Sequence, residues 1–560
     1  MKRLFPLCIV LSALIAGCTP PGTTRPGQDR GGEQPASPKR VTIAMVGEPR
    51  TLNYTVEGSQ PGGTATNAPT LLVNSRMADV YRGTVTGPML ATRIPTVENG
   101  QWVVGADGAM QMTWNLRQDV YWHDGTKFTA NDLLFAAQLG QDKDIPALRD
   151  AAYANVSSLD APDPYTLVSR WRQPYILADS FLGDLEPIPK HLLEAVYQQD
   201  KANVLSDPHF NTDFVGTGPY RLIKWDRGSS MTFAAFDQYA LGRPRIDNLE
   251  LKFILDAELI LAGALAGTID VTVGPRLSLD LGDQANHNWQ DGQAVAQTTT
   301  WVALFPQFVD PIPAVLADVR FRKALMLGTN RPQLTDVLVY GLSPVPDNYL
   351  APGDPLYKDT LSSAVRYPYD PVQAAQMIES LGYAKGVDGF YSSGGQRLSA
   401  EIRTTAGDDL KSKLLLSLAD GWKQIGIEAP TVEIPRQLSD NLEYRVTRPA
   451  FELIRQPDDF TAGGLRRFKG SEAALPSNNY NGQNRTRYQN LELDSLIDRY
   501  VTTIAMSDRV ELARQMVHIL TDQLPIMGMI YSGESTFIAN RLVNVTADRG
   551  TRNVHEWDVK

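Results

Sequence analysis

The clearest alternation of apolar and polar side chains in this chain of 560 residues lies in residues 110–116. A period of two is typical of a strand that buries one face. The sequence therefore predicts a strand here, and its buried face carries the apolar members of the run, Met110, Met112, Trp114 and Leu116.

A turn and a helix start are predicted directly after this strand. His123-Asp124-Gly125-Thr126 favours a turn, because aspartate can bond to the backbone two residues on and glycine accepts a positive φ. Thr129-Ala130-Asn131-Asp132 has the composition of a capping box, so a helix is expected from Ala130. We interpret His123 and Asp124 as turn residues rather than catalytic ones.

Similar periods predict further elements along the chain. Strands are expected at residues 41–45, 250–255, 298–305 and 428–434, and after a turn within 159–171. Helices are expected at 257–266, from 318 onward, and at 371–381, 410–427 and 507–524. Asp318 and Asp370 are the expected N-caps of two of these helices.

The first 39 residues do not fit a folded core. Lys2 and Arg3 precede a short apolar run, residues 4–15, which is too brief to span a bilayer and is typical of an export signal. Leu14-Ile15-Ala16-Gly17-Cys18 resembles the lipobox of bacterial lipoproteins, which implies a signal at residues 1–17 and a lipid on Cys18; the alternative is a plain secretory signal. Residues 18–39, rich in Pro, Gly and charge, are expected to be a flexible tether.

Cysteine content argues against a disulfide-stabilised protein, and net charge argues against a nucleic-acid-binding protein. Of the two cysteines, Cys8 lies in the signal, so no intrachain disulfide can form in the mature protein. The formal net charge of −10 falls to −12 when the two positive charges of the signal are removed, which argues against a nucleic-acid partner. No other apolar run is long enough to cross a membrane.

Several segments resemble the bacterial extracellular solute-binding proteins of family five, the oligopeptide-binding type. The longest is LRQDVYWHDGTKFTANDLLFA, residues 116–136. Asn330 replaces an aspartate that is usual in the family, and residues 77–91 match its pattern only loosely. Further segments follow in the family's order, at residues 186–192, 215–220, 242–249, 318–331, 369–383 and 488–494.

The resemblance implies an α/β protein with the periplasmic-binding-protein-like fold (type II, cluster C), with two large lobes, a smaller extra domain and a ligand cleft between the lobes. It also implies that the lobes are built from interrupted segments. Residues 41–70, 191–300 and 531–560 would form lobe I, residues 71–190 an extra domain II, and residues 301–530 lobe III. The implied protein is a monomer that works with the permease and ATPase subunits of an ABC importer.

No set of residues with the spacing of a known active site is present. A Gly-x-Ser-x-Gly elbow, a His-Glu-x-x-His pair and paired metal-binding cysteines are all missing from the sequence, and its six histidines are scattered. His191 is expected to be a structural residue near a helix start. We therefore expect no enzyme activity, no cofactor and no resident metal.

A solute receptor needs a cleft with aromatic walls and a few placed charges. The charged candidates lie mainly in residues 451–469, where the family's aspartate for a peptide α-amino group would correspond to Asp458 or Asp459. A missing Trp in this segment weakens the implication of peptide specificity. The other candidates are the aromatic residues Trp301, Phe305, Tyr480 and Tyr531, each equally compatible with a place in the core, and the arginines Arg455, Arg466, Arg467 and Arg485, which are ordinarily surface residues.

Three functions remain open. The first is a lipid-anchored receptor that delivers oligopeptides to an ABC importer. The second is the same receptor for an oligosaccharide, a metal chelate or another polar solute. The third is an envelope lipoprotein that acts as a hydrolase or a chaperone.

Overall fold

The structure, a computed structural model, describes residues 37–59, 67–81, 83–148, 151–274, 277–456 and 459–560. Contacts divide the chain into residues 1–38 and residues 39–560. All described helices and strands belong to the second unit. The predicted signal, Cys18 and Asp458 lie outside the described residues.

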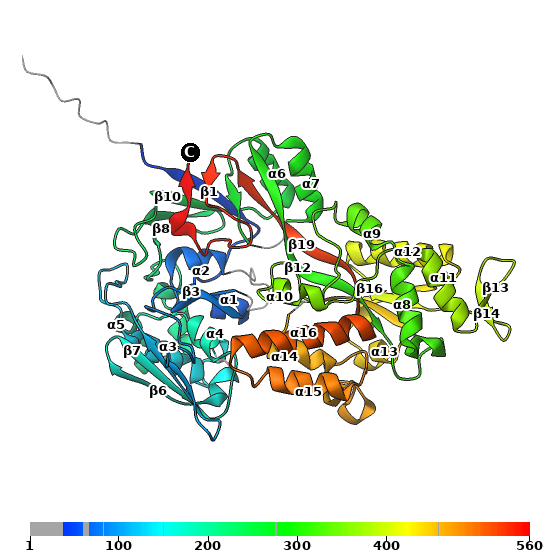
Figure 1. Ribbon diagram of the computed structural model, residues 1–560. Coiled ribbons are helices and arrows are strands. Elements are labelled where there is room, and N and C mark those ends of the chain that lie inside the picture. Colours follow the sequence, from blue (N-terminus) through cyan, green and yellow to red (C-terminus); the bar gives the residue numbers. More distant parts are fainter. Residues whose placement is uncertain (1–36, 60–66, 82, 149–150, 275–276, 457–458) are drawn as a thin grey trace, which may run out of the picture. The chain divides into compact units, whose positions relative to one another are not determined.

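A ten-stranded mixed sheet organises residues 39–560 (Figure 1). Strands β1 and β10 pair in parallel, whereas the long strands β12 and β19 pair antiparallel. The sheet order is β17 (Thr431–Ile434), β16 (Ile402–Thr405), β18 (Phe451–Gln456), β12 (Gly292–Pro306), β19 (Met527–Ala539), β11 (Val271–Thr272), β1 (Arg40–Met45), β10 (Asn248–Phe253), β9 (Ser230–Ala235), β8 (Tyr220–Asp226).

A second, four-stranded antiparallel sheet is formed within residues 102–171. It contains the strand predicted from the alternation at residues 110–116, and its core includes Trp102, Trp114 and Trp171. Helices α3 (Ala130–Gln141) and α4 (Ala178–Gly183) also contribute to this core. The order of strands is β4 (Trp102–Val104), β5 (Met110–Asn115), β7 (Thr166–Trp171), β6 (Val156–Asp163).

The remaining helices and short strands complete the described part of the chain. Three small sheets pair β2 (Ala78–Tyr81) with β3 (Thr84–Pro88), β20 (Leu542–Val543) with β21 (Asp558–Val559), and β14 (Tyr391–Ser393) with β13 (Ala384–Lys385) and β15 (Gln396–Arg397). The helices are α1 (Tyr54–Ser59), α2 (Ala68–Val73), α5 (Lys190–Gln199), α6 (Ala257–Leu265), α7 (Leu279–Asn288), α8 (Val319–Leu327), α9 (Arg331–Leu338), α10 (Tyr357–Thr360), α11 (Pro371–Ser380), α12 (Asp409–Gln424), α13 (Leu442–Val446), α14 (Ala462–Leu465), α15 (Leu491–Tyr500) and α16 (Met506–Gln523).

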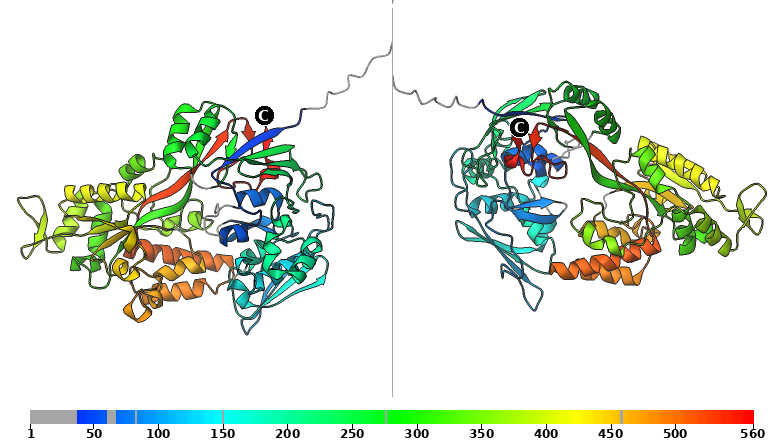
Figure 2. Two further views of the ribbon diagram at one scale, coloured as in Figure 1. Left: turned by 180° about the vertical axis from the view of Figure 1, so that it is seen from behind. Right: turned by 45° about the horizontal axis from the view of Figure 1, so that its top comes forward.

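Residues 301–305 of strand β12 alternate between two different cores. Val302 and Leu304 pack in a core with α8, α11 and α12. Trp301, Ala303 and Phe305 pack in another core with α15 and α16, the orange helices of Figure 2. Successive side chains of a strand point to opposite faces, so the period of two in residues 301–305 assigns each residue to its core.

The predicted helix starts are confirmed by the backbone hydrogen bonds. Asp132 accepts the Thr129 N–H at 2.9 Å, and α3 begins at Ala130 as expected. Asp318 accepts the Arg320 N–H at 2.8 Å, and Asp370 caps α11 in the same way. The strand predicted at residues 298–305 is longer, because β19 pairs with β12 from Gly292 onward.

Three of the segments that carry the family resemblance meet around His123. The His123 N–H donates to the Gly216 carbonyl at 2.9 Å, and the ring lies between the Gly218 carbonyl (3.0 Å) and the Gly216 N–H (3.3 Å). The carboxylate of Asp124 contacts His191 at 2.7 Å. These contacts join segments 116–136, 186–192 and 215–220, which supports the interpretation of both histidines as structural residues.

Candidate functional site

The aromatic candidates on β12 and β19 are buried. Trp301 and Phe305 are each 3% exposed, and Tyr531 is fully buried. The Tyr531 hydroxyl donates to the carbonyls of Asn348 and Leu350 at 2.9 and 2.7 Å. Tyr531 and Phe305 therefore have no open surface for a ligand in this conformation.

Trp301 belongs to a chain of rings that leads toward the segment after β18. Its ring centroid lies 4.9 Å from that of Tyr349, which stacks at 5.4 Å on Phe460. Phe460 in turn meets Tyr500 of α15 at 6.1 Å. Within the described part of the chain, the Trp301 Nε1–H has no hydrogen-bond partner.

Arg455, near the end of β18, is held by a carboxylate. Its Nε and Nη2 each lie 3.1 Å from an oxygen of Asp408, the N-cap of α12, and its Nη1 contacts the Ser532 hydroxyl. Burial raises the pKa of Asp408, but Arg455 outweighs that effect and the net shift is downward. About a third of the Arg455 side chain is exposed.

Asp459 forms a local turn at the start of α14. Its carboxylate accepts the Thr461 N–H at 3.1 Å, and the Thr461 hydroxyl caps α14 by accepting the Gly464 N–H at 3.0 Å. Asp459 directly precedes Phe460, whose ring is linked to Trp301 through Tyr349.

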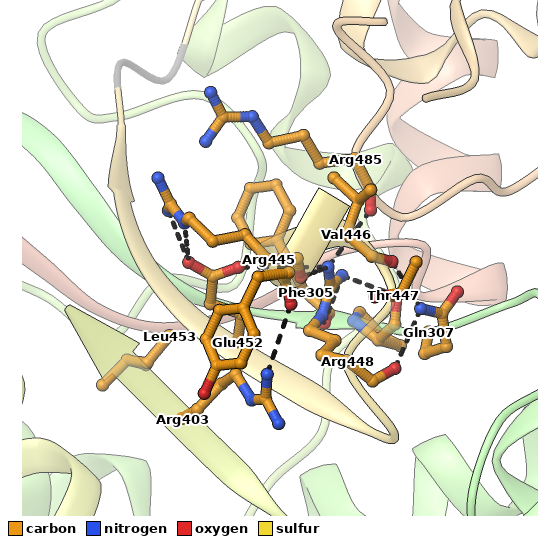
Figure 3. Close-up of polar contacts among 12 residues, drawn as sticks. Phe305, Gln307, Arg403, Arg445, Val446, Thr447, Arg448, Glu452, Leu453 and Arg485 are labelled. Carbon is orange, nitrogen blue, oxygen red and sulfur yellow. Dashed lines mark hydrogen bonds and ion pairs between the residues drawn. The ribbon is translucent and has the colours of Figure 1, made fainter. Parts of the chain in front are cut away.

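Of the other charged and aromatic candidates, Arg467 contacts the chain of rings formed by Trp301, Tyr349 and Phe460. Arg466 forms an exposed ion pair with Glu472 at 2.9 Å, whereas Arg467 donates to the Tyr349 hydroxyl at 2.8 Å. The backbone of Tyr480 adopts the left-handed conformation, with a φ of 59°. Arg485 belongs with α13 and the distal end of β12, where its carbonyl accepts from Arg448 (Figure 3).

The segment after β18 contacts the hairpin of β2 and β3. A Cβ at Gly83, in the turn of this hairpin, would lie 3.8 Å from the Thr461 methyl group. A cavity of about 320 Å³ also borders Gly83. Its walls include Glu186, from the segment 186–192, and residues that the sequence analysis did not name, among them Asn53, Tyr153, Tyr175, Phe181 and Asp184.

The sequence contains little local signal for this cavity. Tyr153, Tyr175 and Phe181 lie in short helical turns and in an irregular segment, where no period of two or 3.6 marks a face. Their convergence depends on how α1, α3 and α4 pack. A family pattern could identify the neighbouring Glu186, which lies in the segment 186–192.

A second cavity of about 210 Å³ lies between residues of the β2–β3 region and α16. Asp179 and Arg509 both line it. Burial raises the pKa of Asp179 to about 6, although the Ser180 N–H and the positive charge of Arg509 oppose the shift. This carboxyl group therefore titrates near neutral pH.

Two structural features are missing from the described residues. None of the described helices is long and apolar enough to cross a membrane. The same residues contain no cluster of three His, Cys, Asp or Glu side chains placed to hold a metal ion.

The large mixed sheet, with the long paired strands β12 and β19 at its centre, defines the class of fold. This is a mixed α/β protein with the periplasmic-binding-protein-like fold, as the resemblance implied. The sequence model described as "Bacterial extracellular solute-binding proteins, family 5 Middle" matches residues 88–456, and the chain belongs to this family. Its members are solute-binding proteins of ABC importers and act outside the cytoplasm.

Three similar proteins illustrate the range of the family. The oligopeptide-binding protein AppA of Bacillus subtilis is 21% identical over 98% of this chain and 97% of its own. Heme-binding protein A of Haemophilus influenzae is 23% identical over 84% of this chain and 83% of its own. The crystal structure of NikZ from Campylobacter jejuni, in complex with Ni(L-His), has a TM-score of 0.61 at 22% identity and covers 93% of this chain and 99% of its own.

Proposed function

We propose that this protein is a lipid-anchored receptor that captures oligopeptides in a cleft between its lobes and delivers them to an ABC importer. The lobes are those expected from the sequence, with lobe I at residues 41–70, 191–300 and 531–560, domain II at 71–190 and lobe III at 301–530. The residues proposed to bind the peptide are Asp459, Arg455 and Trp301, together with Asp458, which lies outside the described residues.

The observation that carries the peptide proposal is the outer edge of β18. β16 pairs with β18 only opposite Phe451 and Glu452, and β18 continues to Gln456. The Phe451 N–H donates to the Glu401 carbonyl across this edge. Because the backbone groups of successive residues in a strand point in opposite directions, the N–H and C=O groups of every second residue after Phe451, up to Arg455, face this same edge. No described strand pairs with this edge beyond Glu452, but the Thr404 hydroxyl of β16 donates to the Leu453 carbonyl at 3.0 Å, so the stretch left for a peptide strand lies around Arg455.

An extended peptide can add a strand to such an edge. Backbone hydrogen bonds then provide affinity that does not depend on the peptide sequence, and pockets for alternate side chains provide selectivity. The α-amino group of the peptide needs an opposite charge once it leaves water. Asp459 lies three residues beyond β18 and can supply that charge together with Asp458, which lies outside the described residues.

The relatives favour one alternative, a receptor for heme or a metal chelate. Native mass spectrometry of the protein purified from its own cells separates the two. We expect a series of bound masses that fragment as peptides, and their loss after the protein is unfolded and refolded. A single bound mass with the isotope pattern of a metal complex would overturn the peptide proposal.

The lipid anchor has a separate test. If Cys18 carries the lipid, Cys18→Ser will move the protein from the membrane fraction to the soluble fraction. Quantitative blotting of both fractions measures the shift, and Ser12→Ala, a change within the apolar run of the signal, is the control that should stay with the membrane. Membrane retention of Cys18→Ser would contradict the anchor.

A further inference from the structure

The cavity of about 320 Å³ beside Gly83 has the size and lining of a small-molecule subsite. Sites for small ligands are concave and largely apolar, with a few placed polar groups, and begin near 300 Å³. Three aromatic residues form part of the wall, and Tyr153 and Phe181 meet edge to face at 4.9 Å. Tyr175 is fixed by stacking on Trp171 at 5.3 Å.

The charged part of the wall has more negative than positive charge. Asp184 and Glu186 line the cavity, and Arg76 forms ion pairs with both. Arg76 and Glu186 are each 5% exposed at the side chain, whereas Asp184 is 41% exposed. With both carboxyl groups ionised the three side chains carry a net charge of −1, although burial raises the pKa of Asp184 and of Glu186.

The two carboxylates are not equally available to a ligand. Glu186 is 3.1 Å from Arg76 and also accepts the Tyr54 N–H at 3.1 Å, so both of its oxygens are engaged. Asp184 contacts Arg76 through Oδ1, and no described group bonds to its Oδ2. The Asp184 side chain is 41% exposed, so its Oδ2 is open to a ligand that enters from solvent.

We infer that this cavity binds an organic cation, an alkylammonium or alkylguanidinium group such as the end of a lysine or arginine side chain. The cation bonds to Asp184 Oδ2, and the alkyl part lies against Tyr153, Tyr175 and Phe181. Aromatic faces attract cations, and a hydrogen bond to a carboxylate is stronger when its donor is charged. This inference rests on the proposed receptor function, and it names the kind of side chain that the receptor prefers.

The subsite can be tested without the natural solute by calorimetry or NMR titration of the full chain. The probes are n-butylammonium and n-butylguanidinium, with 1-butanol as a neutral molecule of similar size. We expect both cations to bind at least tenfold more tightly than 1-butanol. Equal affinity for 1-butanol would mean that the cavity selects only for apolar volume and would overturn the inference.

Two variants locate the binding. Asp184→Asn should weaken the binding of both cations at least tenfold. The matched control is Asp160→Asn, because Asp160 also pairs with an arginine, Arg170, but lies exposed on β6. If Asp184→Asn does not fold, Ala152→Leu keeps the Arg76 pairs and fills the cavity that Ala152 lines. Unchanged cation binding in whichever of the two variants folds would contradict the inference.

The peptides found by native mass spectrometry distinguish this inference from the receptor proposal. Bound peptides enriched in lysine or arginine support both. Bound peptides without such enrichment contradict the cation subsite alone. Cation binding that depends on Asp184, without any bound peptide, contradicts the oligopeptide receptor and leaves the subsite standing.

Discussion

Replacing Arg448 by methionine will lower the free energy of unfolding by about 3–5 kcal/mol, the range observed when one partner of a buried charge network is removed. The Arg448 side chain is fully buried, and burial lowers its pKa to about 10, against the influence of Glu452. Its guanidinium donates at 2.9–3.2 Å to the carbonyls of Phe305, Pro306, Arg445 and Arg485 (Figure 3).

The loss is large because Arg448 joins three segments. Its donors connect the distal end of β12, helix α13 and the loop at Arg485, and Glu452 lies 4.0 Å away. Methionine fills a similar volume but leaves four carbonyls without this donor, and Glu452 keeps its ion pair with Arg445. Lysine keeps the charge but has three donors instead of five. The free energy of unfolding of Arg448→Lys should therefore lie between those of Arg448→Met and the parent.

Urea denaturation measures these differences. The matched control is Arg466→Met, which removes an exposed ion pair with Glu472 and should cost about 0–1 kcal/mol. If Arg448→Met is destabilised no more than Arg466→Met, the guanidinium network does not contribute the stability that we assign to it.

The second large effect is a pH dependence at His123. Burial lowers the pKa of His123 to about 4, and the Gly218 carbonyl only partly offsets this shift. Free histidine has a pKa of about 6.5, so between these values the unfolded chain binds a proton that the folded chain does not. The contribution of His123 to stability is therefore present above about pH 6.5 and is lost as the pH falls toward 4.

The pH dependence of the parent protein also contains an opposite contribution from Asp179, whose pKa is raised to about 6 in the folded state. Comparing a variant with the parent at each pH isolates the contribution of His123. His123→Gln will be destabilised at pH 7, but its deficit relative to the parent should shrink by about 2 kcal/mol at pH 5, where the parent has lost the histidine contribution. His287→Gln, at an exposed site on α7, is the control for the loss of a histidine outside the core. A constant deficit of His123→Gln would contradict the lowered pKa, which NMR titration of the ring can check directly.

Local signals predicted much of the secondary structure. The capping box at Thr129 and the N-caps Asp318 and Asp370 begin helices where expected, because a cap requires only the side chain and N–H groups two or three residues away. The alternation in residues 110–116 became β5 with its apolar side chains inside. Such patterns are complete within one short stretch of chain.

Partners far apart in the sequence needed the tertiary structure. Arg455 is 47 residues from Asp408 and 77 from Ser532, and no local rule predicts that these side chains meet. Likewise, Trp301 and Tyr531 are directly opposed on β12 and β19, and both are buried. The pattern indicated strands but not which strand would cover each aromatic side chain.

By itself, the sequence determined the family, the α/β fold class and the positions of many helices and strands, because those depend on motifs and periods within short stretches. The tertiary structure decided which polar groups lie together: His123 with Gly216 and Gly218, Arg448 with four carbonyls, and Asp184 with Arg76 at the wall of a cavity. Burial, and with it the pKa of a group and its need for a partner, depends on the packing of distant segments. No window of the sequence contains that information.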